Sequence, residues 1–329
     1  MFQGDTTSYI EAINFLSGAL EPSGLIFNRL ITTFGGLQFI ILLEPILGLF
    51  GAWIFMNSIF YILICFVFYK IILTLFESRK TAILATLFLA SNYAMLRFGL
   101  AYLMDIGGWA FYLISIYFTL RYIKYIYQRD LLLASFAVGI GGLFKEYAFL
   151  AIIPIAAILV YENRSSLLNL VKNSFTPALL AVGPIILVYV WAYFQFDYTY
   201  LDWLRVNQTY YLYNSRIVEY IKSLGSLLNV LGILFLGGLL VLWAEWTNID
   251  SRIKLFLLSI FASFLPILFW PAITQRILFI TAPFVIIVSS FLFKKYQKYW
   301  YVFIPVLLFY ILINFFMDSH ILPNVNLPI

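Results

Sequence analysis

Long apolar runs, separated by short charged segments, are the feature that most constrains this chain. Of its 329 residues, 64% are hydrophobic and only 11% are charged. Soluble domains carry about 25% charged residues, because their surface faces water. So few charged side chains cannot cover a water-facing surface of this size, which excludes a soluble globular enzyme and a disordered or fibrous chain. The composition indicates a polytopic membrane protein.

The apolar runs indicate a bundle of transmembrane helices, each of which needs about 20 apolar residues, or fewer where a pair is broken or buried in protein. We therefore predict an all-α bundle of about ten spans, forming a single transmembrane domain over residues 1–329 without a water-soluble part. The predicted spans cover residues 50–76, 80–97, 104–124, 131–144, 147–161, 174–196, 224–246, 253–270, 277–293 and 299–317.

The distribution of Lys and Arg predicts how these spans are oriented. Basic residues are more frequent in every second loop, starting with Arg79 and Lys80, and such loops stay in the cytoplasm. Residues 1–49, the loop 197–223 and the tail 318–329 then lie outside. We expect the multi-pass protein in the plasma (inner) membrane of a microbe, with its active site facing outward.

The predicted outer segments differ from the spans in composition. Arg29, a Gly pair, Glu44 and Pro45 interrupt residues 26–49, which favours juxtamembrane helices in the outer interface. The loop 197–223 is rich in Tyr and Trp, which is typical of an interfacial belt but equally of a substrate lining. The opening residues resemble a polar loop that follows a first transmembrane helix, so we expect that helix to be missing from this sequence.

Residue counts exclude several kinds of site. Cys65 is the only cysteine and His320 the only histidine, so intrachain disulfides, cysteine-based metal sites and multi-histidine metal sites are ruled out. A nucleophile–histidine triad is disfavoured, because the histidine stands near the C-terminal end. The net charge is +5, but the basic residues are scattered without an aromatic-interleaved stripe, so we predict no nucleic-acid partner.

Two aspartates stand where a membrane makes charge expensive, and such residues are functional candidates by default. Asp5 precedes a predicted short helix, and Asp105 begins a predicted span followed by the Gly107-Gly108 pair. Each is explained equally by a helix N-cap, for which Asp is well suited. The functional interpretation is a pair of carboxylates facing one external cavity, with Asp5 as a general base. The two glycines would let a neighbouring helix or a lipid tail approach closely.

Two cationic segments complete the set of candidates. Lys145-Glu146 interrupts an apolar stretch after a run of about 14 residues, too short to cross a hydrocarbon core of about 30 Å. Such a break is tolerated where it lines a polar cavity, and an ammonium there suits a phosphate at the interface. A structural Lys–Glu pair or a snorkelling lysine is the alternative. Arg276 stands at the end of a predicted short outer loop. It is equally interpreted as a ligand of a phosphate group or as an anchor at the membrane interface.

Three ordered patterns within residues 1–165 resemble the GT-C type of integral-membrane glycosyltransferases. They are Gly4-Asp5-Thr6-Thr7-Ser8-Tyr9-Ile10, Tyr102-Leu103-Met104-Asp105 and Gly141-Gly142-Leu143-Phe144-Lys145-Glu146. The protein O-mannosyltransferases and the bacterial aminoarabinose lipid A transferases are similar in pattern. The chain departs from the former, which have an adjacent Asp-Glu pair where it has Asp5-Thr6, and from oligosaccharyltransferases, since no large external domain follows its spans.

The resemblance implies a sugar donor on a polyprenyl phosphate and a lipid, glycan or protein acceptor that offers a hydroxyl. It implies transfer by a single inverting displacement, with Asp5 as catalytic base and Asp105 as a supporting carboxylate. Lys145, with Arg276 or Arg97, would bind the lipid phosphate, and Glu146 and Tyr9 would complete the substrate site. No cofactor is predicted with certainty, and a divalent metal ion stays open.

Two other function classes remain to be weighed at this stage. A transporter or lipid flippase would use the same charges along a translocation path and would often show inverted repeats, of which the sequence shows none. A non-catalytic membrane scaffold would use Asp5 and Asp105 only as helix caps. Convergence of Asp5, Asp105 and Lys145 around one outward-open cavity would favour the enzyme.

Overall fold

The protein is described from a computed structural model over residues 4–18, 24–211, 216–269 and 275–321, and every regular element in these ranges is a helix. This confirms the predicted all-α class. The first half contains α1 (Gly4–Leu16), α2 (Gly24–Phe76), α3 (Arg79–Ala90), α4 (Tyr93–Gly99), α5 (Asp105–Tyr125), α6 (Gln128–Phe144), the 3-10 helix η1 (Glu146–Ala151) and α7 (Ile152–Glu162).

The second half is also helical, with helices of very unequal length. Its elements are α8 (Leu167–Phe196), α9 (Tyr200–Tyr211), α10 (Arg216–Glu245), η2 (Trp246–Asn248), α11 (Ser251–Ala262), η3 (Leu265–Phe269), α12 (Gln275–Leu278), α13 (Thr281–Lys295), η4 (Gln297–Val302) and α14 (Phe303–Ile321).

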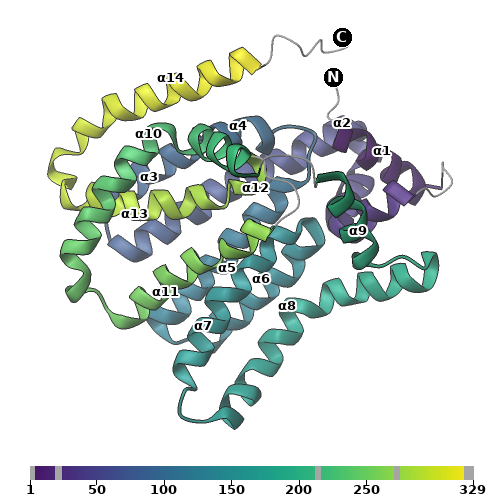
Figure 1. Cartoon of the computed structure of the whole chain (residues 1–329), viewed down its shortest axis with the longest axis horizontal. Helices are drawn as coiled ribbons and strands as arrows, with labels where there is room; N and C mark the ends of the chain where they lie inside the picture. Colours follow the sequence, from purple (N-terminus) through teal and green to yellow (C-terminus); the bar gives the residue numbers. More distant parts are fainter. Residues whose placement is uncertain (1–3, 19–23, 212–215, 270–274, 322–329) are drawn as a thin grey trace.

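The centre of the bundle is the antiparallel pair α5 and α6, which a two-residue turn connects (Figure 1). Helix α2 packs against α5, α8 packs against α6, and α10 packs against α13. Helix α1 lies against α2, and the short α12 contacts α4 and α10. Segments from both ends of the sequence therefore meet beside the start of α5.

The structure does not confirm the predicted number of membrane spans. Among the described residues, four helices are long and apolar enough to cross a membrane, and a pair bent by 54° raises the number to at most five. The predicted ten spans are not confirmed. Several predicted spans are helices of 11 to 17 residues, shorter than the about 20 that a crossing needs. A helix buried inside a bundle is as apolar as one that faces lipid, so the sequence does not separate the two.

Helix α2 is broken at two points that the sequence partly indicates. Thr33 and Gly48 have non-helical backbone angles, and Gly48 has a φ of 69°, which glycine adopts without a steric penalty. The break at Gly48 falls next to the predicted boundary between juxtamembrane residues 26–49 and the span that begins at 50. The predicted outer loop 197–223 also contains helix, since it includes α9, where Trp203 packs against Ile31 and Ala192.

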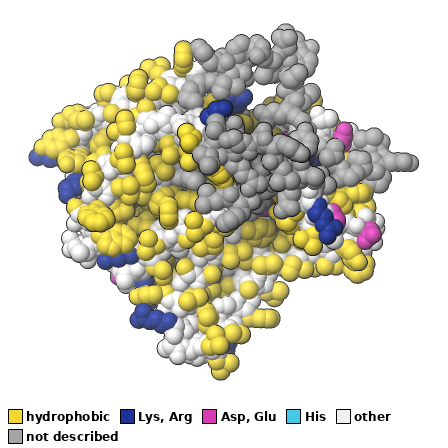
Figure 2. Space-filling model, in the orientation of Figure 1, with side chains coloured by type: hydrophobic (Ala, Val, Ile, Leu, Met, Phe, Trp, Pro, Cys, Tyr) yellow, Lys and Arg dark blue, Asp and Glu magenta, His cyan; other side chains and the backbone are white. Residues whose placement is uncertain are grey.

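Outside the residues drawn in grey, apolar side chains are spread over the face shown in Figure 2, and charged groups are few. Large apolar side chains are widely exposed, including Trp243 at 86%. A soluble monomer rarely exposes such continuous apolar area. The surface and the apolar helices together identify an integral membrane protein.

Candidate active site

Asp5 lies in the first turn of α1 and its carboxylate is held by two arginines. One oxygen accepts from Arg29 of α2, and the other pairs with Arg276 of α12. Helix α1 is fixed in this position because the Thr6 hydroxyl donates to the Tyr102 carbonyl at 3.0 Å, just before α5. The Asp5 side chain therefore forms ion pairs that join α1 to α2 and α12, which a helix cap alone would not require.

Asp105 is the first residue of α5 and is completely buried. Arg276 Nη1 lies 3.7 Å from its Oδ2, and neither carboxylate oxygen has a hydrogen-bond partner among the described residues. A buried charge without hydrogen bonds is costly. The neighbouring Arg276 and the Tyr147 side chain, which also interacts with Asp105, are therefore what supports this buried carboxylate.

Arg276 bridges the two carboxylates, which stand 100 residues apart in the sequence. Its Nη2 pairs with Asp5 and its Nη1 faces Asp105, so one guanidinium holds both acids. The fork of an arginine suits such two-point contacts, and equally the oxygens of a phosphate. The sequence predicts Arg276 as a candidate phosphate ligand, and the structure brings it to both predicted acids.

Lys145 lies beside the same groups, at the break between α6 and η1. Its backbone is extended (φ −167°, ψ 141°), the residue is 6% exposed, and its Nζ lies 3.7 Å from Glu146 Oε2. Its ammonium interacts electrostatically with Tyr9 and Asp105. The predicted interruption of the apolar stretch at Lys145 is therefore a real break that turns a cation toward the start of α5.

Two glycines at the start of α5 allow this close approach. A Cβ on Gly108 would lie 2.6 Å from the Lys145 Cβ, and a Cβ on Gly107 would lie 2.7 Å from the Phe144 ring. Both distances are shorter than real side chains tolerate. Of the two partners that the sequence allows for this pair, a helix or a lipid tail, the structure shows the neighbouring helix end.

We call the six ionisable residues at this place the charged cluster: Asp5, Arg29, Asp105, Lys145, Glu146 and Arg276. Three are cations and three are anions, so their formal charges balance. Tyr9 belongs to its lining, because it is buried and the Arg29 guanidinium lies 4.5 Å from its ring centroid.

The cations of the cluster determine the protonation of Asp5. Burial by itself would raise the pKa of the Asp5 carboxyl, but Arg29 and Arg276 outweigh burial and hold that pKa well below its usual range. Asp5 is thus fully ionised near neutral pH. A carboxylate held in this way is a weak base until the guanidinium groups find another anion.

Arg29 and Tyr147 are members of this region that the sequence does not single out. Arg29 appears in the sequence only as an interruption of a juxtamembrane stretch, although a charge in an apolar helix is itself a functional signal. Tyr147 interacts with Asp105 and Arg276 and stands next to Glu146. No sequence signal identifies it, since tyrosine is common throughout this chain.

Arg97 is the predicted residue that the structure does not bring into the charged cluster. It lies on α4, donates to the Tyr93 hydroxyl and contacts the rings of Tyr93 and Phe98. Within the described part of the chain it forms no ion pair with the two aspartates. Arg97 belongs to α4, which ends at Gly99, whereas the charged cluster lies at the start of the next helix, α5.

The sequence leaves open whether the site holds a divalent metal ion, and the described part of the chain gives no ligand group that supports one. In the ranges that the structure describes, no three residues of the types His, Cys, Asp and Glu are grouped so that they could hold a metal. The two aspartates that would be closest to such a role are already joined by Arg276.

A comparison with protein families finds one match in the first part of the chain. Residues 47–194 match the family described as dolichyl-phosphate-mannose-protein mannosyltransferase. The match includes Asp105, Lys145 and Glu146, whereas Asp5 and Arg276 lie outside it. Neither the curated proteins nor the solved structures gave a match. Over residues 47–194 the chain thus carries the pattern of a mannosyltransferase family, which supports its assignment to the GT-C type of membrane glycosyltransferases.

Proposed function

We propose that this protein transfers a sugar from a polyprenyl-phosphate donor to an acceptor hydroxyl, with inversion at the anomeric carbon. The observation that carries this proposal is the charged cluster, whose members come from five distant segments and meet at the start of α5. Ionisable groups buried in an apolar bundle are costly, and function is the usual reason for their presence. The family match over residues 47–194 supports sugar transfer in particular.

The cations of the cluster suit the phosphate of the donor. Arg29, Lys145 and Arg276 lie around Asp5, and guanidinium groups bind phosphate oxygens in two-point contacts. An entering phosphate competes with Asp5 for the two arginines. As the guanidinium groups turn to the phosphate, the Asp5 carboxylate loses its partners, and its basicity rises.

The freed Asp5 carboxylate then acts as the base of a single displacement. It takes the proton of the acceptor hydroxyl while the acceptor oxygen bonds to the anomeric carbon and the bond from that carbon to the phosphate oxygen breaks. The leaving polyprenyl phosphate carries away the electron pair. Lys145 and Arg276 stabilise its growing charge, which is the larger contribution in such reactions.

Asp105 supports this chemistry by orienting Arg276, which it faces at 3.7 Å from inside the bundle. Glu146 holds Lys145 in place at 3.7 Å, and Tyr9 positions Arg29 beneath its ring. Arg97 has no part in this proposal.

We place the reaction on the extracytoplasmic side of a microbial inner membrane. The support is the bias of Lys and Arg toward the opposite loops, which predicts that those loops are cytoplasmic. The cluster follows the loop between α4 and α5, which the same prediction assigns to the side opposite to those basic loops. The domain organisation stays a single transmembrane unit with juxtamembrane helices before residue 50.

The test uses purified protein in lipid vesicles with polyprenyl-phosphate donors that carry different radiolabelled sugars. We expect release of polyprenyl phosphate from at least one donor. Asp5→Asn should slow transfer by about 10²–10⁴-fold, the contribution of a general base, while donor binding persists. Glu11→Gln is the matched control, since Glu11 lies on the same helix and outside the charged cluster.

Two results would count against the proposal. Full transfer activity of Asp5→Asn would remove Asp5 from the role of base. Movement of labelled donor between leaflets, without consumption of any sugar in the panel, would favour a lipid transporter instead.

A further inference from the structure

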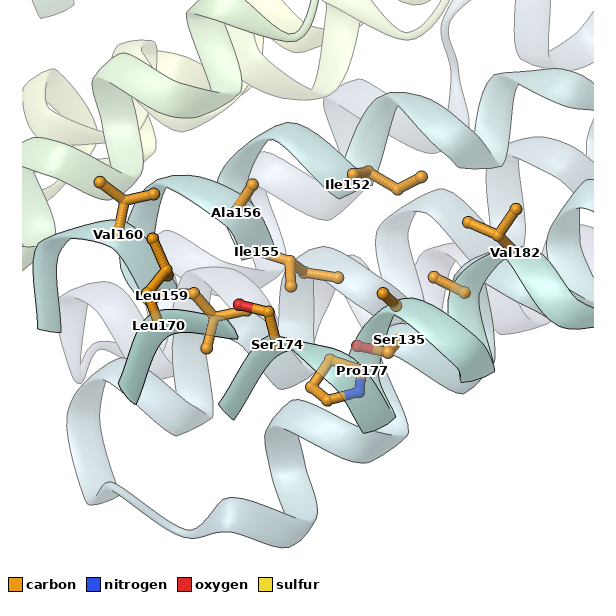
Figure 3. Close-up of a pocket in the computed structure, with 12 residues that line it drawn as sticks. Ser135, Ile152, Ile155, Ala156, Leu159, Val160, Leu170, Ser174, Pro177 and Val182 are labelled. Atoms are coloured by element: carbon orange, nitrogen blue, oxygen red, sulfur yellow. The ribbon is translucent and has the colours of Figure 1, made fainter. Parts of the chain in front are cut away.

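An apolar hollow lies between α7 and α8, away from the charged cluster. Its volume is about 270 Å³, and α6, α7 and α8 form its walls (Figure 3). Small side chains line this space, namely Ala156 on α7 and Pro177, Ala178 and Ala181 on α8. The hollow is therefore a consequence of the sequence, which places alanine and proline at positions where the helices could otherwise close.

The lining of the hollow suits hydrocarbon and offers little to a polar ligand. Of the twelve residues around it, ten are apolar and the others are Ser135 and Ser174. The Ser135 hydroxyl donates to the Leu131 carbonyl of its own helix at 3.0 Å, so its proton is already used. Exposed apolar side chains such as Leu179 and Phe175 lie next to it on α8, as on a lipid-facing surface.

The same walls lead from the hollow to the charged cluster. Ile152, at one end of the hollow, stands seven residues after Lys145, which corresponds to about 14 Å at most with the 2.0 Å rise of a 3-10 helix. On the facing wall, Val182 of the hollow lies two turns before Tyr189. Glu146 of the cluster interacts electrostatically with Tyr189.

We infer that this hollow holds part of the prenyl chain of the donor lipid, whose phosphate lies at Lys145 and Arg276. The inference rests on the function proposed above and adds a selection for chain length. A long chain leaving the phosphate along η1 and α7 reaches the hollow, whereas a chain of two isoprene units ends before it. Burial of the distal units then contributes to donor affinity.

The experiment compares a long-chain donor with the same sugar on a two-isoprene phosphate. Ala156→Phe and Ala178→Phe fill the hollow, and both positions are exposed, so the added rings need no space in the packed core. We expect each to raise KM for the long-chain donor by about tenfold or more, as lost burial of a few methylene groups requires. KM for the short donor should stay unchanged.

Leu179→Phe is the matched control. This substitution adds a ring on α8, as Ala178→Phe does, but Leu179 is exposed and does not line the hollow. It should leave KM for both donors as in the wild type. Equal KM values for the long donor in filled and wild-type proteins would overturn the inference. If the wild type transfers sugar from neither donor, the proposed function itself fails, which is a different result.

A labelling experiment tests the occupant without using activity. A long-chain polyprenyl phosphate with a photoreactive group far from its phosphate should label peptides that contain residues 152–160 or 170–182. Photoreactive phosphatidylcholine should label them much less. Equal labelling by both probes would mean that bulk lipid fills the hollow, and labelling elsewhere would place the prenyl chain on another surface; both results overturn the inference.

Discussion

Two buried aspartates open neighbouring helices of the bundle, and only one of them belongs to the charged cluster. Asp105 begins α5 and is 0% exposed, and Asp130 lies in the first turn of α6 and is 1% exposed. Each has an arginine partner, Arg276 at 3.7 Å and Arg121 at 3.2 Å. Because the two helices are antiparallel and Asp130 faces Arg121, 16 residues after Asp105 on α5, the two aspartates lie about 24 Å apart along the pair.

The difference lies in what surrounds each carboxylate. Arg121, from the neighbouring helix, faces Asp130, and no second acid shares that arginine in the described residues. Arg276, in contrast, is shared between Asp105 and Asp5, and Lys145 lies nearby. A first-turn position favours any carboxylate through the helix dipole, which is sufficient to explain Asp130. It does not explain why three acids and three cations meet at the start of α5.

The strongest test of this comparison replaces each aspartate by asparagine. Asp105→Asn should lower the transfer rate by about two orders of magnitude, because a preorganised charge is lost next to Arg276. Asp130→Asn should leave the rate per folded molecule unchanged and lower the free energy of unfolding by about 1–3 kcal/mol, since a buried polar partner of Arg121 is lost. Single-turnover transfer and denaturation in detergent measure the two effects.

The distinction between Asp105 and Asp130 would be contradicted if both variants lost transfer activity to the same degree, with each rate divided by the folded fraction of the protein. The Asp130 end of the pair would then also take part in function. A loss of stability in Asp105→Asn as large as that in Asp130→Asn, with unchanged transfer, would make Asp105 a structural residue.

A second test concerns the arginine that joins the two acids. Arg276→Lys keeps the charge but removes the fork that faces Asp5 and Asp105 at once. We expect kcat/KM to fall by about 10- to 100-fold, the range for loss of one charge-assisted hydrogen bond. Arg97→Lys is the control, because the interactions of the Arg97 guanidinium among the described residues are with Tyr93 and Phe98 of its own helix α4. Equal losses in the two variants would show that Arg276 has no special position.

A third test changes the distance between α5 and Lys145 without touching a charge. Gly108→Ala places a methyl group where the Lys145 side chain and backbone now lie. We expect about a tenfold loss of kcat/KM, because overpacking of this kind costs about 1–3 kcal/mol and shifts the lysine. Gly225→Ala on α10 has open space and should behave as wild type. Wild-type transfer by Gly108→Ala would mean that the position of Lys145 is not critical.

These comparisons also show which parts of the molecule were predictable. The cost of charge in an apolar chain singles out Asp5, Asp105 and Lys145, and the structure brings all three together. That cost is a property of each residue and its neighbours in sequence, so it can be found without a fold. The all-α class follows from the same apolar runs.

The remaining features depend on contacts between distant segments. The bridge made by Arg276 joins residues 5, 105 and 276, and no local pattern contains all three. Arg29 is missed because its stretch is assigned to the interface before its partner is known. The span count is not confirmed, because short helices such as α7 have the apolar composition of a crossing helix but not its length.

The smallest expected effect is a pH dependence of stability that comes from Asp5. Its pKa is depressed in the folded protein from the model-peptide value of 3.8. Such a group contributes stability above pH 3.8, and this contribution is lost as the pH falls toward the depressed folded pKa. The Tm of the wild type should therefore fall more steeply between about pH 5 and pH 3 than that of Asp5→Asn, which lacks the group. Thermal unfolding in detergent across this range measures the difference. Parallel Tm profiles would show that Arg29 and Arg276 do not hold the Asp5 carboxylate in the ligand-free protein, and the exchange of these arginines from Asp5 to the donor phosphate would then have no basis.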